Sequence, residues 1–421
     1  MVSTGTIIIR FLILITVLIL LNLYAFHGLK TATIKLAPKW RSIIHWTYWI
    51  FSIGLFASVI ISFFMFRSGA ISFPTLMKFI GVLFSFILAK LVFLCFLFSE
   101  DIFRVVRAVI VWVTNFFIEN KNADVFTARR AFISQIGLAT AALPVAGMVY
   151  GMIKGKYDFR LRKETLHYPD LPSSFDGFTI TQISDIHSGS FDDRDGVLKG
   201  IRMAMSVKSD LLVFTGDLVN NSSEEIEPWL KDFAQLHAPY GKFSILGNHD
   251  YGDYISWDSD EAKNKNFQAM KDNHELLGFR LLLNENIHIE KDEEKISLIG
   301  VENWGVGFKQ KGDLGKALTG VDPDNFKILL SHDPSHWEEE VMDHQQQHIH
   351  LTLSGHTHGM QFGVEIGGFK WSPVKYRYPR WAGLYEEAGK FLYVNRGFGF
   401  LGFPGRVGIW PEITQITLRK K

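Results

Sequence analysis

Five short polar clusters in the C-terminal half of the chain carry residue types that bind divalent cations. The last, Gly355-His356-Thr357-His358-Gly359, follows the apolar run 349–353 and places two histidines in a turn bracketed by glycines. Carboxylate and amide oxygens mixed with imidazole nitrogens, without sulfur, suit two divalent cations. The candidate metal ligands are Asp185, His187, Asp217, Asn248, His332, His356 and His358.

The spacing within the clusters favours shared metal binding. Residues i and i+2 of an extended segment face the same side, so Asp185 and His187 can hold one ion together. Asp217, which follows Gly216, is the candidate bridge between two ions. A single aspartate after glycine usually belongs to a turn, but the joint occurrence of five clusters favours a metal site. A further group, His344, His348 and His350, is interpreted as a polar loop that precedes a strand.

The elements that must position these clusters alternate between strands and helices. Such alternation predicts a sheet that is at least partly parallel, with helices on its faces, and ligands in such folds gather beyond the carboxyl ends of the strands. The predicted strands before the clusters are 178–184, 210–215, 242–246, 327–330 and 349–353, and the predicted helices are 196–207, 225–236 and 261–276. Further strands are expected at 279–283, 295–300, 390–395 and 413–418.

In chain order the clusters read Asp-x-His, Gly-Asp-x-x-Asn, Gly-Asn-His-Asp, a lone His and Gly-His-x-His. This series resembles the pattern of the calcineurin-like metallophosphoesterase superfamily over residues 178–359. The tail, with Tyr385, Tyr393-Val394-Asn395-Arg396-Gly397 and Pro411-Glu412-Ile413, looks like the membrane-tethered or exported bacterial branch. The resemblance implies an α/β metallophosphoesterase domain, with mixed β-sheets sandwiched between helices, that hydrolyses a phosphate ester.

The resemblance also implies a role for each matching position. A first metal would be held by Asp185, His187, Asp217 and His358, and a second by Asp217, Asn248, His332 and His356. His249 falls where the family has a histidine that contacts the scissile phosphate. The metals of the family vary among Mn, Fe, Zn and Mg, and the sequence does not choose between them.

Four further residues are expected near this centre. Asp250 and Asp333 would orient His249 and His332 from outside the ligand set. Arg396 and Arg406, in a glycine-rich tail, could reach a substrate phosphate, although arginines in such loops are commonly solvated or paired at the surface.

The N-terminal part of the chain is dominated by Ile, Leu, Phe and Val. Its apolar runs are long enough to cross a hydrocarbon layer of ~30 Å at ~1.5 Å per residue, and we interpret the first as a retained helix. The predicted organisation is a helical transmembrane region at 1–153, a linker and domain entry at 154–177 and the phosphoesterase domain at 178–421. The predicted spans are 7–27, 43–66, 74–98 and 132–153, with an interfacial helix at 102–118.

Charge and cysteine content narrow the class further. The chain has 44 basic and 43 acidic residues, so no nucleic-acid partner is expected. Cys95 is the one cysteine, which excludes intrachain disulfides and a zinc site built on thiolates.

Basic residues in the loops predict how the spans are oriented. The loops after the first and third spans are the more basic, which places them in the cytoplasm and the catalytic domain outside it, in a bacterial inner membrane. Arg129-Arg130 before the fourth span resembles an internal twin-arginine signal. Five basic residues just after that span, within 154–163, favour the opposite orientation.

The leading functional hypothesis is a membrane-anchored, metal-dependent phosphoester hydrolase. Four spans exceed what tethering needs, so its substrate could be lipid-linked, and the aromatic-rich loop 362–381 could dip toward lipid. One alternative is a cytoplasm-facing pyrophosphatase of a nucleotide-activated lipid intermediate of the UDP-diacylglucosamine type. Another is a catalytically inactive membrane scaffold, which is disfavoured because no ligand is missing. The oligomeric state is left open.

Overall fold

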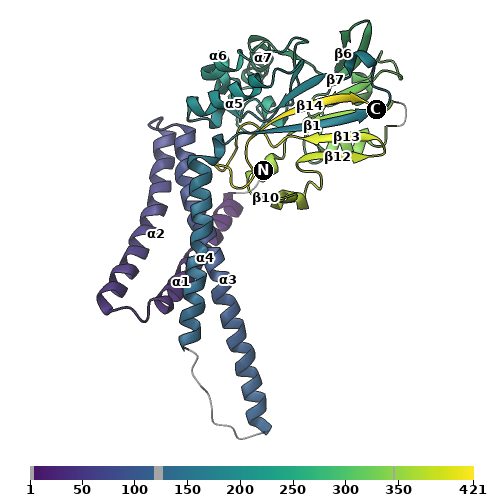
Figure 1. Ribbon diagram of the computed structural model, residues 1–421. Helices are drawn as coiled ribbons and strands as arrows, with labels where there is room; N and C mark the ends of the chain where they lie inside the picture. The colour runs from purple at the N-terminus through teal and green to yellow at the C-terminus, as the bar shows by residue number, and fades with distance from the viewer. Residues whose placement is uncertain (1–3, 118–126, 345–346) are drawn as a thin grey trace. The chain divides into compact units, whose positions relative to one another are not determined.

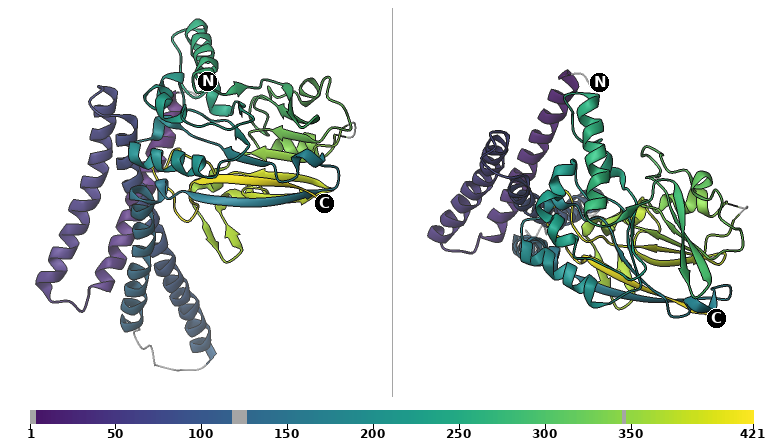
Figure 2. Two further views of the ribbon diagram at one scale, coloured as in Figure 1. Left: turned by 45° about the horizontal axis from the view of Figure 1, so that its top comes forward. Right: turned by 90° about the horizontal axis from the view of Figure 1, so that it is seen from above.

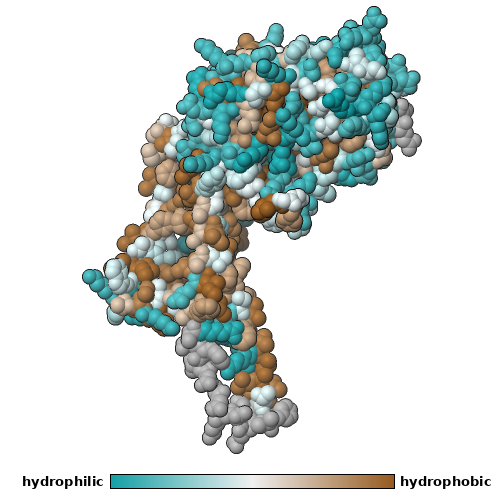
Figure 3. Space-filling view, in the orientation of Figure 1, coloured by the Kyte–Doolittle hydropathy of each residue, from teal (hydrophilic) through white to brown (hydrophobic). Residues whose placement is uncertain are grey.

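The computed structural model describes residues 4–117, 127–344 and 347–421. The chain divides into two compact units, Met1–Tyr150 and Gly151–Lys421. Figure 3 shows mostly apolar surface on the helices of the first unit and mostly hydrophilic surface on the second. This contrast matches the change in composition along the sequence.

Among its described residues, the first unit contains four helices, and all four are long and apolar enough to cross a membrane (Figure 1). The four predicted spans lie within them. Their bounds are α1 Thr4–Ala32, α2 Pro38–Arg67, α3 Phe73–Phe117 and α4 Thr127–Ile153.

The prediction of a separate interfacial helix at 102–118 was wrong. Its described residues continue α3, which runs for 45 residues without a break, and Ile118 lies outside the described residues. The run was interpreted as interfacial because Arg104 and Arg107 lie near its start and because it is short for a span, yet the preceding carboxylates Glu100 and Asp101 are partnered within the bundle. Glu100 lies 3.4 Å from Arg129 Nε, and Asp101 accepts a hydrogen bond from Tyr24 Oη at 2.6 Å. No glycine or proline stands near this pair to interrupt the helix.

The second unit is a sandwich of two six-stranded mixed sheets, as the sequence predicted (Figures 1 and 2). The sheet orders are β1-β14-β2-β3-β4-β5 and β12-β13-β9-β8-β7-β6. The first sheet comprises β1 Arg160–Tyr168, β2 Thr179–Ile183, β3 Leu211–Phe214, β4 Lys242–Ser244, β5 Arg280–Leu281 and β14 Glu412–Lys420. The second comprises β6 Glu285–Lys291, β7 Glu294–Gly300, β8 Lys327–Leu330, β9 Leu351–Ser354, β12 Gly383–Glu387 and β13 Lys390–Val394.

The layers are held together by apolar side chains on both faces of each sheet. One buried cluster fills the space between the sheets and takes Ile180, Val213, Leu298, Ile328 and Leu353 from both of them. A second cluster joins the outer face of the first sheet to helices α5 Arg194–Ser206, α6 Leu230–Phe233 and α7 Asp260–Leu276. A third covers the second sheet and includes the short helix α8 Leu314–Ala317. Figure 1 shows α5, α6 and α7 together on one side of the domain.

Two segments differ from the expected elements. Residues 160–168, expected in the linker, form β1, which pairs in parallel with β14 near the other end of the chain. The helix predicted at 225–236 is instead a 3₁₀ segment, Ser223–Trp229, followed by the short α6. Pro228 explains the second difference, because proline lacks the N–H that a continuous α-helix needs.

Candidate metal centre

The predicted ligands follow five strands whose carboxyl ends meet at one edge of the sandwich. Strands β2, β3 and β4 run parallel in the first sheet, and β8 and β9 run parallel in the second. Asp217, after β3, has Oδ2 3.1 Å from Nε2 of His332, after β8. The backbone N–H of His356 donates to Oδ1 of Asp185 at 2.9 Å. The two sheets therefore contribute to one polar site.

The backbone of this site lies largely in the left-handed region. Each such non-glycine residue costs ~1–2 kcal/mol, so a cluster of them points to a functional requirement. Positive φ values occur at Asp185 (51°), His187 (47°), Asp217 (61°), His356 (72°) and His358 (49°). Five of the seven predicted ligands thus have a backbone conformation that turns their side chains into the site.

Two glycines allow these loops to approach one another. A Cβ on Gly355 would lie 1.9 Å from Ser184 Oγ and 2.2 Å from Asp185 Oδ2. A Cβ on Gly247 would lie 2.2 Å from Asp217 Oδ1. Both distances are far inside van der Waals contact, so the glycines of the two motifs are required by the packing of the loops against the carboxylates.

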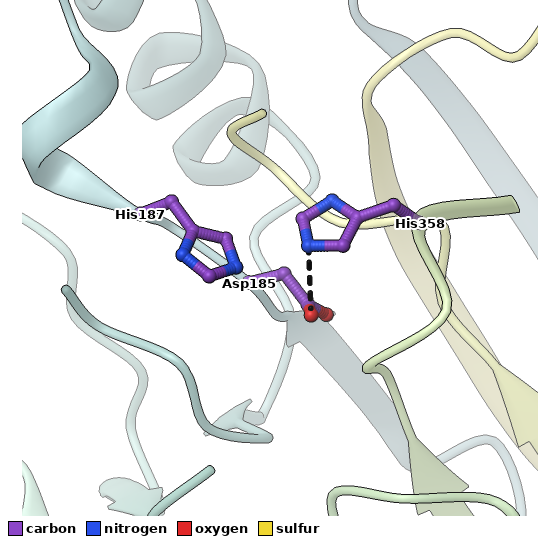
Figure 4. A group of neighbouring side chains, drawn as sticks. All are labelled: Asp185, His187 and His358. Atoms are coloured by element: carbon purple, nitrogen blue, oxygen red, sulfur yellow. Dashed lines mark ion pairs between the residues drawn. The ribbon is translucent and has the colours of Figure 1, made fainter. Parts of the chain in front are cut away.

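The first group of ligands comprises Asp185, His187 and His358 (Figure 4). Nε2 of His358 lies 3.2 Å from Oδ1 of Asp185. The rings of His187 and His358 have centroids 4.8 Å apart. All three side chains are buried, and their donor atoms lie within 4.8 Å of one another.

The second group comprises Asp217, His332 and His356. Nδ1 of His356 lies 3.3 Å from Nε2 of His332 and 2.9 Å from Oδ1 of Asn248. Asn248 therefore joins this group. The Oδ2 atom of Asp217 lies 3.1 Å from Nε2 of His332 and 3.5 Å from Nε2 of His187, between the two groups.

Backbone carbonyl groups orient three of the imidazoles. His332 Nδ1 donates to the Thr215 carbonyl at 2.7 Å, and His249 Nδ1 donates to the Asn220 carbonyl at 2.6 Å. His187 Nδ1 lies 3.2 Å from the Val219 carbonyl. A carbonyl only accepts, so Nδ1 carries a proton in each of these rings, and Nε2 faces the site.

Neighbouring charges set the protonation of the site. Burial opposes ionisation of Asp217, but His332, His249 and His187 outweigh it and hold the pKa of this carboxyl well below its usual range. Burial also opposes the charge on His332, yet Asp217 raises the pKa of this imidazole to about 10. Burial lowers the pKa of His187. The site thus combines ionised carboxylates with a neutral His187, and a cation that binds would displace the extra proton of His332, because metal ligands must be deprotonated.

The donor set fits divalent cations. Among the described residues, Nε2 of His187 and Nε2 of His358 are buried without a hydrogen-bond partner, and each faces a carboxylate. Buried imidazole nitrogens of this kind ordinarily have a partner, and a cation between each nitrogen and its carboxylate would supply one. The mixed oxygen and nitrogen ligands suit Mn, Fe, Zn or Mg, and their number suits two ions.

Comparisons with known proteins agree with this geometry. The family model described as calcineurin-like phosphoesterase matches residues 178–360, and that described as probable calcineurin-like phosphoesterase, transmembrane domain, matches residues 6–156. The uncharacterized metallophosphoesterase YkuE of Bacillus subtilis is 30% identical over 301 residues, which cover 69% of this chain and 98% of that protein. The chain belongs to the calcineurin-like phosphoesterases. It is a metallophosphoesterase, a phosphoester hydrolase whose domain implies divalent metal ions.

Two other relatives of this phosphoesterase carry more specific names. A transmembrane protein with metallophosphoesterase domain from Bos taurus is 31% identical over 263 residues, 59% of this chain and about half (54%) of that protein. The UDP-2,3-diacylglucosamine pyrophosphatase LpxG of Chlamydia trachomatis is 31% identical over 282 residues, 55% of this chain and 81% of that protein. The family assignment and the four apolar helices together make the chain a membrane protein.

The two flanking aspartates contact other partners than the sequence suggested. Asp250 accepts hydrogen bonds from the backbone N–H groups of Asp217 and Gly247 at 3.0 and 2.8 Å, so it orders the backbone of two ligand loops and not the His249 ring. Burial, followed by the charge of Asp217, raises the pKa of Asp250 to about 7. Asp333 Oδ2 lies 3.4 Å from Nε2 of His356 and does not orient His332.

The two tail arginines are buried and make internal contacts. The Arg396 guanidinium lies 2.5 Å from carboxylate oxygens of both Glu412 and Glu365 and is almost fully buried. Arg406 is fully buried, donates to the Gly399 carbonyl and lies 3.1 Å from His358 Nδ1. These contacts engage part of each guanidinium, and Nη1 of Arg406 is buried without a hydrogen-bond partner among the described residues, so contact of either arginine with a substrate phosphate stays a prediction.

Three residues near the centre were not among the predicted site residues. Asn220 Oδ1 lies 3.1 Å from His187 Nδ1, and its place in the Gly-Asp-x-x-Asn motif was a signal for it. Tyr254 packs on the His249 ring at 4.3 Å and accepts a hydrogen bond from Asn248 Nδ2 at 2.7 Å. Tyr378 Oη lies 2.9 Å from His356 Nε2. The two tyrosines come from irregular segments, whose side-chain directions no periodic pattern predicts.

Proposed function

We propose that this chain hydrolyses a phosphate ester at a dinuclear metal centre. Asp185, His187, Asp217 and His358 would hold the first ion, and Asp217, Asn248, His332 and His356 the second. The observation that carries the proposal is the place of Asp217, whose single Oδ2 atom faces an imidazole nitrogen of each group at 3.1 and 3.5 Å. A carboxylate between two ligand groups is suited to bridge two ions.

The roles of the protein's own residues follow from their contacts. When bound, two divalent ions offset the negative charge that develops on the phosphoryl group and make water a better nucleophile. His249, held through Nδ1 by the Asn220 carbonyl, has Nε2 left to hydrogen-bond a phosphate oxygen or to protonate the leaving oxygen. Tyr254 packs on the same ring and limits its rotation. Asp250 fixes the backbone of the Asp217 loop, so the bridging carboxylate stays in place during turnover.

Turnover of bis-p-nitrophenyl phosphate by the full chain in detergent, with added Mn, tests this centre. Asp217→Ala should reduce turnover roughly 10²–10³-fold, the scale on which loss of one charge-stabilising group slows an enzyme. Asp272→Ala, which removes a carboxylate from the exposed side of α7, is the matched control and should retain activity. Full activity of Asp217→Ala would overturn the dinuclear mechanism.

The membrane spans support a lipid-linked phosphoester as the substrate. The catalytic unit begins at the end of an apolar helix that is long enough to cross a membrane, so the active site is tethered to one. The similarity to proteins named UDP-2,3-diacylglucosamine pyrophosphatase, at 31% and 29% identity, favours a nucleotide-activated lipid as one specific candidate. Release of UMP from UDP-2,3-diacylglucosamine in mixed micelles would support it. Turnover of the p-nitrophenyl ester without UMP release would reject this substrate and leave the hydrolase assignment intact.

Two observations favour opposite sides of the membrane for the catalytic domain. The basic loops after the first and third spans favour a catalytic domain outside the cytoplasm, whereas a nucleotide-activated substrate favours the cytoplasmic side. Alkaline phosphatase and a fluorescent protein fused after Lys421 would distinguish the two. An active phosphatase fusion supports the external orientation, and a fluorescent fusion with inactive phosphatase supports the cytoplasmic pyrophosphatase.

A further inference from the structure

A short β-hairpin extends from the catalytic unit close to the metal centre. Its strands are β10 Val364–Ile366 and β11 Phe369–Trp371, which pair antiparallel with Ile366 opposite Phe369. Gly367 and Gly368 form its tip with φ values of 57° and 87°, as a two-residue hairpin turn requires. Figure 2 (left) shows the hairpin in yellow-green, projecting from the body of the domain.

The hairpin exposes large apolar side chains. Ile366 is 74% exposed and its cross-strand partner Phe369 is 63% exposed. Tyr376, in the following 3₁₀ turn Pro373–Tyr376, is 78% exposed, and Met360, just before the hairpin, is 58% exposed. Single exposed apolar residues are ordinary, but four large ones within a short segment mark a surface that another phase or molecule covers.

The charge of this segment is mainly basic. Residues 360–380 contain Lys370, Lys375, Arg377 and Arg380 and one acidic residue, Glu365, whose carboxylate pairs with the buried Arg396. Lys370, Lys375 and Arg377 are exposed, and Lys375 Nζ lies 5.2 Å from the Tyr376 ring centroid. Exposed aromatic and aliphatic side chains next to lysine and arginine are typical of protein segments that enter the headgroup region of anionic membranes.

The base of the hairpin is attached to the end of the fourth span. Gly151 lies in the last turn of α4 and belongs to the catalytic unit, and its carbonyl accepts the N–H of Arg406 at 3.2 Å. The next residue, Val407, pairs with the strand that leads into the hairpin: its N–H donates to Gln361, and its carbonyl accepts from Gly363, at 2.7 and 2.9 Å. Backbone hydrogen bonds of Arg406 and Val407 therefore connect the C-terminal end of α4 to the segment that leads into the hairpin.

The same segment connects the hairpin to the metal centre. Val364 follows the ligand His358 by six residues, so their Cα atoms are at most ~20 Å apart. Ser372, at the end of β11, donates to the Gly359 carbonyl at 2.8 Å and so holds the base of the hairpin beside the ligand turn. The hairpin and the ligand turn therefore belong to one segment that is linked at its base.

We propose that the β10–β11 hairpin inserts Ile366 and Phe369 into the interfacial region of an anionic phospholipid membrane, the one that α4 leaves. Lys375 and Arg377 contact the headgroup phosphates there. The hairpin thereby holds the metal centre over the lipid surface, and a lipid-linked phosphoester reaches the ligands along it. The access route rests on the proposed hydrolase function, whereas the membrane contact does not.

The membrane contact is tested on the full chain in lipid nanodiscs. Cys95→Ser/Phe369→Cys is labelled with the environment-sensitive dye NBD in phosphatidylcholine discs with and without phosphatidylglycerol, and brominated phosphatidylcholine serves as the quencher. The matched control carries the label at Lys265→Cys on the exposed face of α7. We expect blue-shifted, bromolipid-quenched emission at residue 369, stronger with phosphatidylglycerol, and water-like emission at residue 265. Lys375→Gln/Arg377→Gln should remove the dependence on phosphatidylglycerol.

The access route is tested by activity. Ile366→Asp/Phe369→Asp should lower turnover of vesicle-embedded UDP-2,3-diacylglucosamine roughly tenfold or more while leaving bis-p-nitrophenyl phosphate turnover unchanged, because only the lipid reaction uses the hairpin. Leu276→Asp, an exposed apolar residue at the end of α7, is the control.

Water-like emission at residue 369 would overturn the membrane contact. The same result is expected if the natural partner of the hairpin is a soluble protein, because the nanodiscs contain none. Membrane insertion without turnover of either ester would instead refute the hydrolase proposal. The two failures are therefore distinguishable.

Discussion

Replacement of Asn220 by alanine isolates the contribution of a residue that touches the metal ligands without being one. Asn220 Oδ1 is one of two acceptors near His187 Nδ1, at 3.1 Å, and the Val219 carbonyl at 3.2 Å is the other. The backbone carbonyl of residue 220, which holds His249, is retained in the variant. Asn220→Ala therefore loosens the His187 ring and leaves the His249 contact in place.

The magnitude follows from the number of acceptors lost. Loss of the outer partner of a metal-ligating histidine lowers metal affinity ~10–100-fold, about 1.4–2.7 kcal/mol. Because the Val219 carbonyl survives, we expect the lower end, ~10-fold, and only at the ion that His187 holds. The other ion, held through His332 and His356, should bind as before.

Mn titration by calorimetry, with metal content measured after gel filtration, checks this expectation. Asn220→Ala should retain one ion at limiting Mn and two at excess, and kcat for bis-p-nitrophenyl phosphate should recover as Mn increases. The control is Asn221→Ala. The Asn221 side chain donates through Nδ2 to Oε1 of Glu225 at 3.5 Å. Wild-type Mn affinity at both sites in Asn220→Ala, or an equal loss at both, would refute the reasoning.

Four other outcomes are expected. His356→Ala should empty mainly the second site and His358→Ala the first, and loss of both metals on His358→Ala would count against the assignment. Burial lowers the pKa of His274 to about 3, so the unfolded chain binds a proton near pH 6.5 that the folded chain refuses. Stability should fall by about 1.4 kcal/mol per pH unit below 6.5, and thermal unfolding of His274→Gln should show a shallower decline. Gly355→Ala places a methyl 1.9 Å from Ser184 Oγ and should destabilise the site by ~1–3 kcal/mol, whereas Gly315→Ala, whose nearest atom is 3.6 Å away, should be neutral by thermal melting. EDTA should lower the Tm and Mn should restore it, because each ion at ~100 times its Kd adds ~2.7 kcal/mol, and an unchanged Tm would argue against metal binding.

The membrane region shows how far hydropathy reaches. Length and composition suffice for four apolar helices, since each depends on residues that are neighbours in the chain. The run after the third predicted span was assigned to a separate helix because Arg104 and Arg107 lie near its start and it is short for a span. In the structure the helix continues, and Glu100 and Asp101 are paired within the bundle. Their partners Arg129 and Tyr24 come from other helices, and that pairing exists only after the bundle forms.

The same distinction applies to the sheets. A strand buried on both faces, such as β3, is a continuous apolar run that is visible locally. Strand β1 contains both basic and acidic residues and has no apolar run. It forms a strand because it pairs with β14, about 250 residues later. No local pattern contains that partner.

For the metal centre, the sequence by itself determined the ligand types and their order, because each motif is a short segment in which strand, turn and donor are adjacent. Only the tertiary structure decided which donor faces which. In the folded protein, Asp217 Oδ2 lies between the two groups and Asp333 contacts His356. Arg396 and Arg406 make internal contacts. The reason is physical: the direction of a side chain in an irregular loop depends on acceptors and charges that come from distant strands, and these meet only at the edge of the folded sandwich.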